Sequence, residues 1–330
     1  MKNWIRAALA GVTIALSAPG VSAQDEITVA YFLEWPMPFL AAKADGSYDK
    51  ALGTKVNWRS FDTGTAMSAA MAAGDVQISV SQGLPPFVVA TSAGQDLQII
   101  DIAVSYSDND NCVVRTDLEI DKNNASELAG KKVAVPLGTA AHYGFLRQMA
   151  HFGVDLGKLE IVNMAPPEGA AAIAQKAVDM ACGWGGALAR MKEHGNVLLT
   201  GAEKEALGIL VFDVTSTPAR FAAEHEDLLA RFVKVTADAN ARWAAGGERA
   251  KMLATIAKES GMDPAATEKS LATMTFPPLD AQLSGKWLGG GVQKFMKGVA
   301  DVFLQAGSIK SALPTYENAV TVAPMKAAAR

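Results

Sequence analysis

Two short stretches carry the strongest pattern in the chain: Val80-Ser81-Gln82-Gly83-Leu84-Pro85-Pro86-Phe87-Val88-Val89 and Val133-Ala134-Val135-Pro136-Leu137-Gly138-Thr139-Ala140-Ala141-His142-Tyr143. Each predicts an apolar strand, a tight turn with Gly or Pro, and the first turn of a helix. A helix start exposes unpaired backbone N–H groups at the positive end of the dipole. It can hold a small anion without a charged side chain. Two such starts indicate a protein that grips a small acid between two lobes.

Strands and helices alternate around these stretches. Strands are predicted at 27–31, 56–59, 76–80, 99–103, 112–114, 133–135 and 159–162, with helices at 64–73 and 140–152. This alternation predicts an α/β fold with mixed, largely parallel sheets. After about Pro218 helices dominate, at 226–245, 249–259, 264–274 and 285–306. We therefore expect a chain that crosses between two lobes twice and ends in the first.

The N-terminus has the pattern of a secretory signal. Lys2 and Arg6 precede a short apolar run, and Val21-Ser22-Ala23 is a small-x-small cleavage site. We expect cleavage after Ala23, so that the mature chain begins at Gln24 and is exported. No later apolar stretch is long enough for a membrane anchor. The formal net charge of −4 argues against a nucleic-acid partner.

Cys112 and Cys182 are the only cysteines, and both lie in predicted strands. Two interpretations stay open, one disulfide or two buried free thiols. The cysteines do not form a Cys-x-x-Cys pair, and the four histidines do not form His-Glu-x-x-His. A Gly-x-Ser-x-Gly turn is also missing. We therefore expect no metal, no cofactor and no enzymatic activity.

Five blocks of the sequence carry a family resemblance: 58–64, 73–78, 130–136, 139–143 and 159–167. In these blocks the chain resembles the periplasmic taurine-binding proteins of ABC importers. The wider family includes binders of alkanesulfonates, nitrate-like anions and thiamine-precursor pyrimidines. The resemblance implies a two-lobed periplasmic binding protein of type II, the Venus flytrap. Its partners would be a small-molecule ligand and an inner-membrane ABC permease, and the protein would be a monomer.

The resemblance also implies where the lobes divide. The two hinge crossovers are expected near 104–112 and 212–218. Lobe one would then comprise residues 24–108 and 216–330, and lobe two residues 109–215.

At the acid-binding end, the resemblance places Thr139, Ala140 and Ala141 at the helix start of lobe two. Their N–H groups and the Thr139 hydroxyl would hold a sulfonate or carboxylate. The alternative interpretation of this stretch is an ordinary N-cap.

Gln82, Gly83 and Leu84 form the counterpart in lobe one. Gln82 would donate an amide N–H to the same anion, and Gly83 would let the ligand approach the backbone. Taurine-binding proteins carry smaller residues at this turn, so Gln82 predicts a reshaped pocket.

At the cation-binding end, the resemblance places Asp213 against the ligand ammonium, because a lone carboxylate in an apolar strand needs a partner. The alternative partner is a buried backbone group or Lys. Glu34 would add a second contact and Trp35 a cation–π contact. Trp184 would wall the pocket, or pack as plain core. His142 is a further candidate for a ligand contact, and its alternative is a structural role. The alternative for Glu34 is a solvated loop charge.

The favoured function is that of a receptor for a small zwitterionic sulfonate, taurine first, which delivers it to a permease. The same fold could instead bind another alkanesulfonate, a betaine or amino acid-like solute, or a pyrimidine. A third interpretation, an enzyme of the pyrimidine-synthase branch, would need a reactive His and Cys arrangement that the sequence does not provide.

Overall fold

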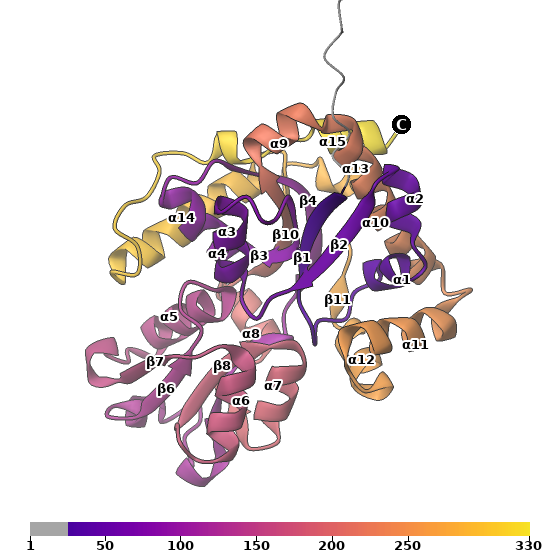
Figure 1. Ribbon diagram of the computed structural model, residues 1–330. Coiled ribbons are helices and arrows are strands. Elements are labelled where there is room, and N and C mark those ends of the chain that lie inside the picture. The colour runs from indigo at the N-terminus through magenta and orange to yellow at the C-terminus, as the bar shows by residue number, and fades with distance from the viewer. Residues whose placement is uncertain (1–25) are drawn as a thin grey trace, which may run out of the picture.

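Two lobes, each built on its own sheet, make up residues 26–330, the part of the chain that the computed structural model describes (Figure 1). The predicted signal sequence and the mature end at Gln24 lie outside the described residues. The first sheet has the order β11-β4-β10-β3-β1-β2, and the second β7-β6-β8-β5-β9. The α/β fold class is thus confirmed.

The strands of the first sheet are β1 (Glu26–Tyr31), β2 (Lys55–Ser60), β3 (Ile78–Gly83), β4 (Leu97–Tyr106), β10 (Val211–Pro218) and β11 (Met274–Thr275). Those of the second are β5 (Asp110–Arg115), β6 (Lys132–Val135), β7 (Glu160–Asn163), β8 (Met180–Trp184) and β9 (Gly195–Val197). Both sheets are mixed, as expected. The parallel pairs are those of β1 with β2 and β3, and of β6 with β7 and β8. The antiparallel pairs are those of β10 with β3 and β4, of β11 with β4, and of β5 with β8 and β9.

The helices of the first half are α1 (Phe39–Ala44), α2 (Ser47–Leu52), α3 (Gly64–Ala72), α4 (Leu84–Ser92), α5 (Ala140–Phe152), α6 (Pro166–Ala174), α7 (Gly185–Lys192) and α8 (Gly201–Ala206). Those that follow are α9 (Ala219–Glu224), α10 (Glu226–Ala245), α11 (Arg249–Ser260), α12 (Pro264–Leu271), α13 (Leu279–Gln282), α14 (Gly291–Gln305) and α15 (Ala323–Ala328). Short 3₁₀ turns lie at η1 (Thr116–Leu118), η2 (Ala125–Leu128), η3 (Leu156–Lys158) and η4 (Glu317–Ala319).

Local capping sets the starts of the two helices that were predicted in the first half. The Thr63 side chain accepts a hydrogen bond from the Ala66 N–H at the start of α3. Thr139 does the same for the His142 N–H at the start of α5, whose bounds match the prediction. A Thr at the N-cap satisfies one donor that the helix leaves unpaired.

Two of the late helices differ from the prediction. Helix α12 ends at Leu271 because Met274 and Thr275 turn into a strand that pairs with β4. Helix α14 begins at Gly291, six residues later than expected. Gly289 and Gly290 directly precede it, and Gly290 has a φ of +127°, which a helix cannot contain.

The chain passes between the lobes at two places. It leaves the first sheet after Tyr106 and enters the second at Asp110. It is back in the first sheet from Val211, because β10 pairs with β4 over its whole length. As a proposal for the lobe boundaries we keep the first change near 109 and place the second near 210 instead of 215.

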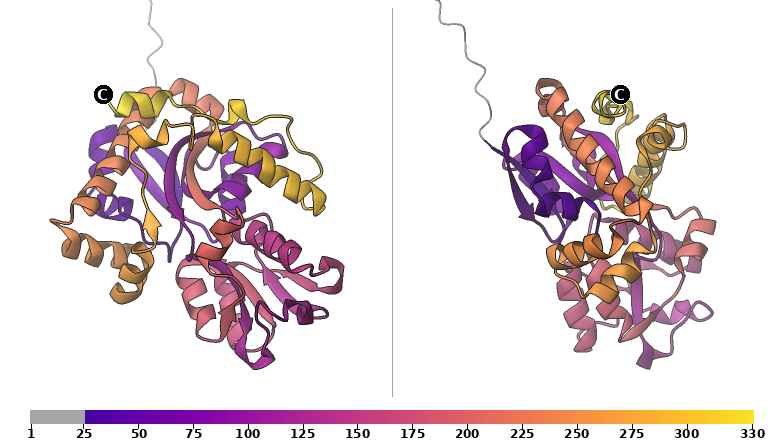
Figure 2. Two further views of the ribbon diagram at one scale, coloured as in Figure 1. Left: turned by 180° about the vertical axis from the view of Figure 1, so that it is seen from behind. Right: turned by 90° about the vertical axis from the view of Figure 1, so that its right-hand side faces the viewer.

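The C-terminal helices pack around the first lobe, as Figure 2 shows from behind and from the side. Helix α10 packs against α15, and α14 packs against both α4 and α5. The last third of the chain therefore completes lobe one and also touches lobe two through α14. Among residues 26–330, no helix has both the length and the apolar character needed to cross a membrane.

Candidate functional site

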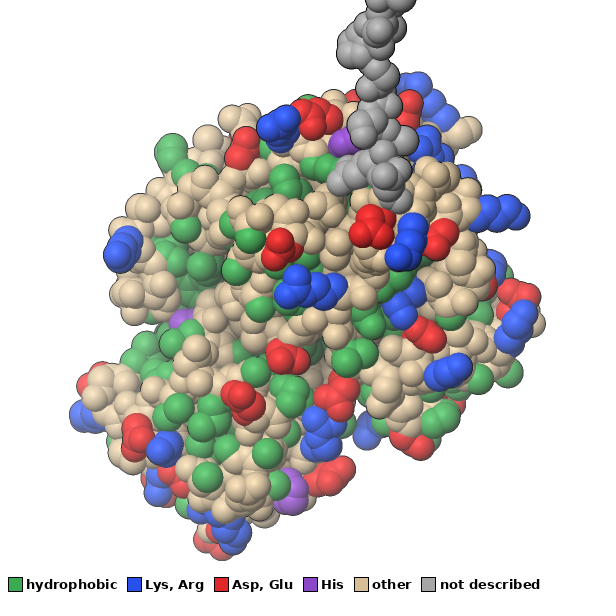
Figure 3. Space-filling view, viewed as in Figure 1, with side chains coloured by type: hydrophobic (Ala, Val, Ile, Leu, Met, Phe, Trp, Pro, Cys, Tyr) green, Lys and Arg blue, Asp and Glu red, His purple; other side chains and the backbone are tan. Residues whose placement is uncertain are grey.

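A pocket lies where the ends of the strands of the two lobes face each other. In open α/β sheets, ligands bind beyond the carboxyl ends of the parallel strands, here those of β1, β3, β6 and β8. The space-filling view shows a furrow between the lobes at this level (Figure 3). The pocket has a free space of about 280 Å³, part of it open to solvent. Its lining residues are Phe32, Trp35, Gly64, Gly83, Pro86, Tyr106, Asp110, Thr139, Ala140, Trp184 and Asp213.

Asp213 is the carboxylate that lobe one contributes. It is 2% exposed, and each of its oxygens accepts one hydrogen bond, Oδ1 from the Tyr106 hydroxyl at 2.7 Å and Oδ2 from the Ser81 hydroxyl at 2.6 Å. Burial raises the pKa of Asp213 to about 7, against the opposing effect of these two hydrogen bonds. Within residues 26–330, two hydroxyl groups thus hold the carboxylate in place, and no cationic side chain pairs with it.

Ser81 connects Asp213 to the aromatic wall. Its hydroxyl accepts a hydrogen bond from Trp35 Nε1 at 2.9 Å while it donates to Asp213. Ser81 has a φ of +58°, a left-handed conformation that costs energy for a residue with a Cβ. Its contacts suggest why the chain keeps this conformation, since it aims the hydroxyl between the indole and the carboxylate.

Asp110 is a second carboxylate in the same pocket, supplied by lobe two. Its side chain is 1% exposed, and no hydrogen-bond partner within residues 26–330 reaches its Oδ2. Burial raises the pKa of Asp110 to about 6, and the charge of Lys204 opposes the rise. The Lys204 ammonium is itself buried and donates to the backbone carbonyl of Asp110. Asp110 also raises the pKa of Asp213 through charge repulsion.

Aromatic rings from both lobes wall the pocket. The rings of Trp35 and Tyr106 meet edge to face, with centroids 4.8 Å apart. Phe32 of lobe one meets Trp184 of lobe two across the cleft, with centroids 5.8 Å apart. Both rings of this second pair also line a larger outer depression at the mouth of the cleft. They therefore lie between the inner pocket and the outer depression.

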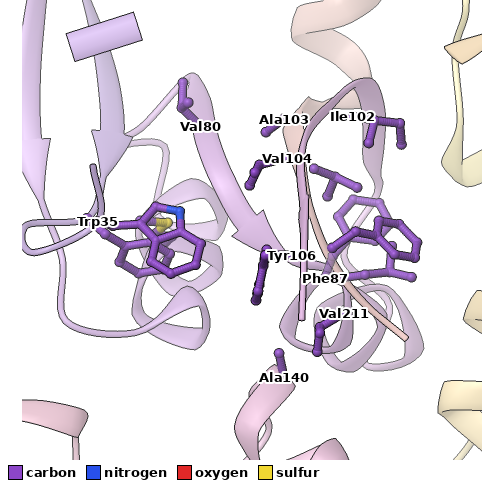
Figure 4. Packing of buried hydrophobic residues seen from close by; sticks show 14 of the residues in the cluster. Trp35, Val80, Phe87, Ile102, Ala103, Val104, Tyr106, Ala140 and Val211 are labelled. Carbon is purple, nitrogen blue, oxygen red and sulfur yellow. The ribbon is translucent and has the colours of Figure 1, made fainter. Parts of the chain in front are cut away.

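The start of α5 faces this pocket from lobe two. Thr139 and Ala140 line the pocket, and Ala141 is buried directly behind them. Within the described chain, no acceptor is assigned to the backbone N–H of Ala140 or Ala141. The Thr139 hydroxyl is already engaged, because it donates to the Pro136 carbonyl at 2.6 Å. Figure 4 shows Ala140 at the tip of its helix, below Tyr106.

The helix start of lobe one is weaker than expected as an anion site. Gly83 lines the pocket, but Pro85 and Pro86 occupy the first turn of α4 and have no N–H to donate. The Leu84 side chain is buried and does not line the pocket. Gln82 is fully buried, and its amide nitrogen donates to the Gly64 carbonyl and the Ser68 hydroxyl. The predicted donation from Gln82 to an anion is therefore replaced by a structural role.

Glu34 lies outside the inner pocket, at the mouth of the cleft. Both of its carboxylate oxygens bind the Arg190 guanidinium on α7 of lobe two, at 2.5 and 3.0 Å. Its backbone carbonyl accepts a hydrogen bond from the Gly186 N–H at 3.0 Å. The contacts of Glu34 thus join the two lobes, and the side chain is neither solvated alone nor turned toward the inner pocket.

His142 also lies outside the pocket. Its Nδ1 accepts a hydrogen bond from the Gly138 N–H at 3.0 Å, and its ring stacks on Phe303 of α14. Burial lowers the pKa of His142 to about 4, so the ring is neutral at pH 7. This placement corresponds to the structural alternative for His142.

Six of the predicted site residues thus line one pocket: Trp35, Gly83, Thr139, Ala140, Trp184 and Asp213. Five others, Glu34, Gln82, Leu84, Ala141 and His142, do not line it. Sequence reasoning missed Phe32, Tyr106 and Asp110, which do. Asp110 had a usable signal, because an acid at the first position of an apolar strand directly after a hinge crossover is unusual.

The two cysteines lie beneath the pocket. Cys112 and Cys182 form a disulfide between directly opposed residues of β5 and β8. The same antiparallel register places Asp110, two residues before Cys112, opposite Trp184, two residues after Cys182. Side chains two residues apart on a strand share one face. The disulfide therefore joins the two strands that carry these pocket residues, and free thiols are excluded in this structure.

Comparisons with known proteins agree with this architecture. Residues 36–250 match the model of the family described as "NMT1/THI5 like". The chain is 29% identical over 324 residues to the taurine-binding periplasmic protein of Escherichia coli K12, covering 97% of both chains.

Two solved structures share the fold. One is the alkanesulfonate-binding protein SsuA from Xanthomonas axonopodis pv. citri bound to MOPS, with a TM-score of 0.75, 22% identity, and coverage of 92% of this chain and 100% of that chain. The other is the periplasmic aliphatic sulphonate binding protein SsuA from Escherichia coli, with a TM-score of 0.69, 19% identity, and coverage of 88% of this chain and 96% of that chain.

Proposed function

The chain belongs to the NMT1/THI5-like family, and from this membership we propose that it is the periplasmic solute-binding component of an ABC importer. We propose a small zwitterionic sulfonate as its ligand, with taurine as the first candidate. The full-length similarity to a taurine-binding periplasmic protein supports this choice. The protein would bind the ligand as a monomer and deliver it to an inner-membrane permease.

One observation carries the proposal: the pocket has two poles of opposite character a few ångströms apart. A Cβ placed on Gly83 would lie 3.5 Å from the Ala140 Cβ and 3.6 Å from Asp213 Oδ1. The unpaired N–H groups at the start of α5 favour an acid, and the buried carboxylate of Asp213 favours a cation. A short molecule with an acid at one end and an ammonium at the other satisfies both poles.

Closure of the lobes would follow from differential binding. Asp213, Trp35 and Tyr106 belong to lobe one, whereas Ala140, Asp110 and Trp184 belong to lobe two. The open form can offer one set at a time, and the closed form offers both. A ligand that contacts both sets therefore shifts the population toward the closed form.

The pocket argues against the two other classes of ligand. A simple alkanesulfonate brings no cation, so it would leave Asp213 and Asp110 unpaired in a low-dielectric space. A neutral pyrimidine would leave the same charges unpaired. We also propose that the protein is a binder and not an enzyme, which its similarity to a taurine-binding periplasmic protein supports.

The test is calorimetric titration of the purified mature protein with taurine, an unsubstituted alkanesulfonate, glycine betaine and a thiamine-precursor pyrimidine. Taurine should bind most tightly, and it should also raise the melting temperature by mass action. A pyrimidine or alkanesulfonate that binds more tightly than taurine would overturn the proposal.

Asp213→Asn is the matched variant. It should weaken taurine binding by roughly 2–5 kcal/mol, the cost of removing one partner of a buried charge pair. Its fold should survive at pH 8. Because the pKa of Asp213 is raised in the folded protein, the ionised carboxylate destabilises the fold at pH values above the ordinary pKa of aspartate, and the neutral amide removes this cost. An unchanged affinity for taurine would remove Asp213 from the ligand site.

Export is part of the same proposal and rests on the N-terminal sequence. Mass spectrometry of protein from a periplasmic extract should find Gln24 as the first residue. An intact Met1 in that fraction would contradict it.

A further inference from the structure

The Asp110 carboxylate interacts with the charge of the buried Lys204, but its hydrogen bonding is incomplete. It is 1% exposed, it lines the inner pocket, and its Oδ2 has no partner within residues 26–330. A buried charged oxygen without a donor costs more than a lost neutral hydrogen bond. Lys204 is the nearest buried cation, and it donates to the Asp110 backbone carbonyl instead. Asp110 therefore needs a donor from the pocket side.

Asp213 complements this need. Each of its oxygens accepts one hydroxyl hydrogen bond, from Tyr106 or from Ser81. A carboxylate has about four acceptor sites, so Asp213 can accept further bonds from a ligand. Asp110 and Asp213 line the same pocket from opposite lobes, and Asp110 raises the pKa of Asp213 through charge repulsion. One ammonium between them could donate to both.

Resting on the proposed function, we propose that Asp110 and Asp213 together bind the ligand's amine, so that the site selects an ammonium with at least two N–H groups. A primary ammonium has three donors and can bridge both carboxylates. A trimethylammonium group has none, although the aromatic walls could still attract its charge. With that ligand the Asp110 oxygen stays unpaired in the closed form. The number of N–H groups on the amine would thus decide which solutes the protein accepts.

The experiment measures affinities by calorimetry at pH 8 for taurine, N-methyltaurine and N,N,N-trimethyltaurine. Wild type should bind taurine at least about 100-fold more tightly than the trimethyl compound, with N-methyltaurine within about 10-fold of taurine. Asp110→Asn should lose about 10- to 100-fold in taurine affinity. It should also reduce the ratio of the affinity for taurine to the affinity for the trimethyl compound.

Asp108→Asn is the control. Asp108 lies two residues away and outside the inner pocket, where its Oδ1 accepts a hydrogen bond from the Gly201 N–H, which the Asn oxygen can also do. Its taurine affinity should stay within about twofold of wild type. A thermal melt of each variant without ligand reports whether the fold is kept.

The outcomes separate the two proposals. If taurine binds but Asp110→Asn has the wild-type affinity, or if the trimethyl compound binds as tightly as taurine, the role of Asp110 is wrong and the proposed function stands. If no taurine derivative binds, the proposed function is wrong, and the same comparison with β-alanine and its trimethyl derivative decides on Asp110. Failure of both series to bind would overturn both.

Discussion

At the residue scale, His142 illustrates how a position beside a binding turn can serve the fold instead. Its neutral ring accepts a hydrogen bond from Gly138, the residue that precedes the N-cap of α5, and stacks on Phe303 of the other lobe. Gly138 has a φ of +77°, so the turn needs glycine there. His142 thus fixes the turn that presents Ala140 to the pocket.

The lowered pKa of His142 predicts a pH dependence of stability. Its pKa of about 4 lies below the ordinary value of about 6.5, so the unfolded chain takes up the proton first. The contribution of His142 is fully present above pH 6.5 and is lost as the pH falls toward 4. The loss should reach about 3 kcal/mol.

The variant for this prediction is His142→Asn, because the Asn side chain can accept the Gly138 hydrogen bond without titrating. Urea unfolding should be followed between pH 7 and 4 for both proteins. The variant will be less stable at pH 7 through the lost stacking, but its stability should fall less steeply with acid. Parallel curves for the two proteins would show that His142 does not titrate as its burial predicts.

At the scale of the element, the two helix starts that the sequence offers are unequal. Helix α5 presents N–H groups to the pocket, whereas the first turn of α4 contains Pro85 and Pro86. The acid of the ligand should therefore bind mainly to α5. In lobe one, Gly83 supplies space, since a side chain there would approach both Ala140 and Asp213.

Replacing Ala140 with Pro tests the role of α5. Ala140 is the first residue of the helix, where Pro is tolerated, and Thr139 before it has the extended conformation that Pro favours. Ala140→Pro removes one N–H donor, so taurine affinity should fall about 10-fold or more. The free energy of unfolding should change by no more than about 1 kcal/mol.

Ala140→Gly is the matched control, since it keeps the N–H and the space. Its affinity, measured by the same calorimetric titration, should stay close to that of wild type. Equal affinities for the Pro variant, the Gly variant and wild type would remove the start of α5 from the ligand site.

At the scale of the whole molecule, contacts at Glu34 hold the lobes together. Glu34 has a φ of +54°, and its backbone N–H donates to Ser260 of lobe one while its carbonyl accepts from Gly186 of lobe two. Its ion pair with Arg190 is partly exposed, with 30% and 45% of the two side chains accessible. Exposed ion pairs contribute little, usually below about 1 kcal/mol. The close backbone approach should matter more for closure.

Two variants separate these contributions. A Cβ on Gly185 would lie 2.2 Å from the Glu34 carbonyl oxygen, so Gly185→Ala should block closure. Its taurine affinity should fall by more than about 10-fold, whereas Arg190→Ala should lose only about 2- to 5-fold.

Small-angle scattering with saturating taurine gives the independent measurement. Wild type and Arg190→Ala should become more compact on binding, and Gly185→Ala should not. If Gly185→Ala closes as wild type does, the approach of Gly185 to Glu34 does not control closure.

Features that arise from neighbouring residues could be predicted from the sequence. The N-cap at Thr139, the bounds of α5 and the alternation of strands and helices follow from local preferences, which act within a few positions of the chain. The unusual acid within an apolar strand, Asp213, was visible for the same reason.

The partner of each polar side chain could not be predicted in this way, because it depends on how the chain folds. Glu34 binds Arg190, 156 positions away. The Gln82 amide donates to Gly64 and Ser68 and accepts from Ser216, so neither side chain is free to bind a ligand. Asp110 enters the pocket because β5 pairs in register with β8, which is also why Cys112 meets Cys182. These contacts join residues that are distant in sequence. Polar side chains that pair in this way follow no periodic pattern along the chain, so the sequence does not predict their partners.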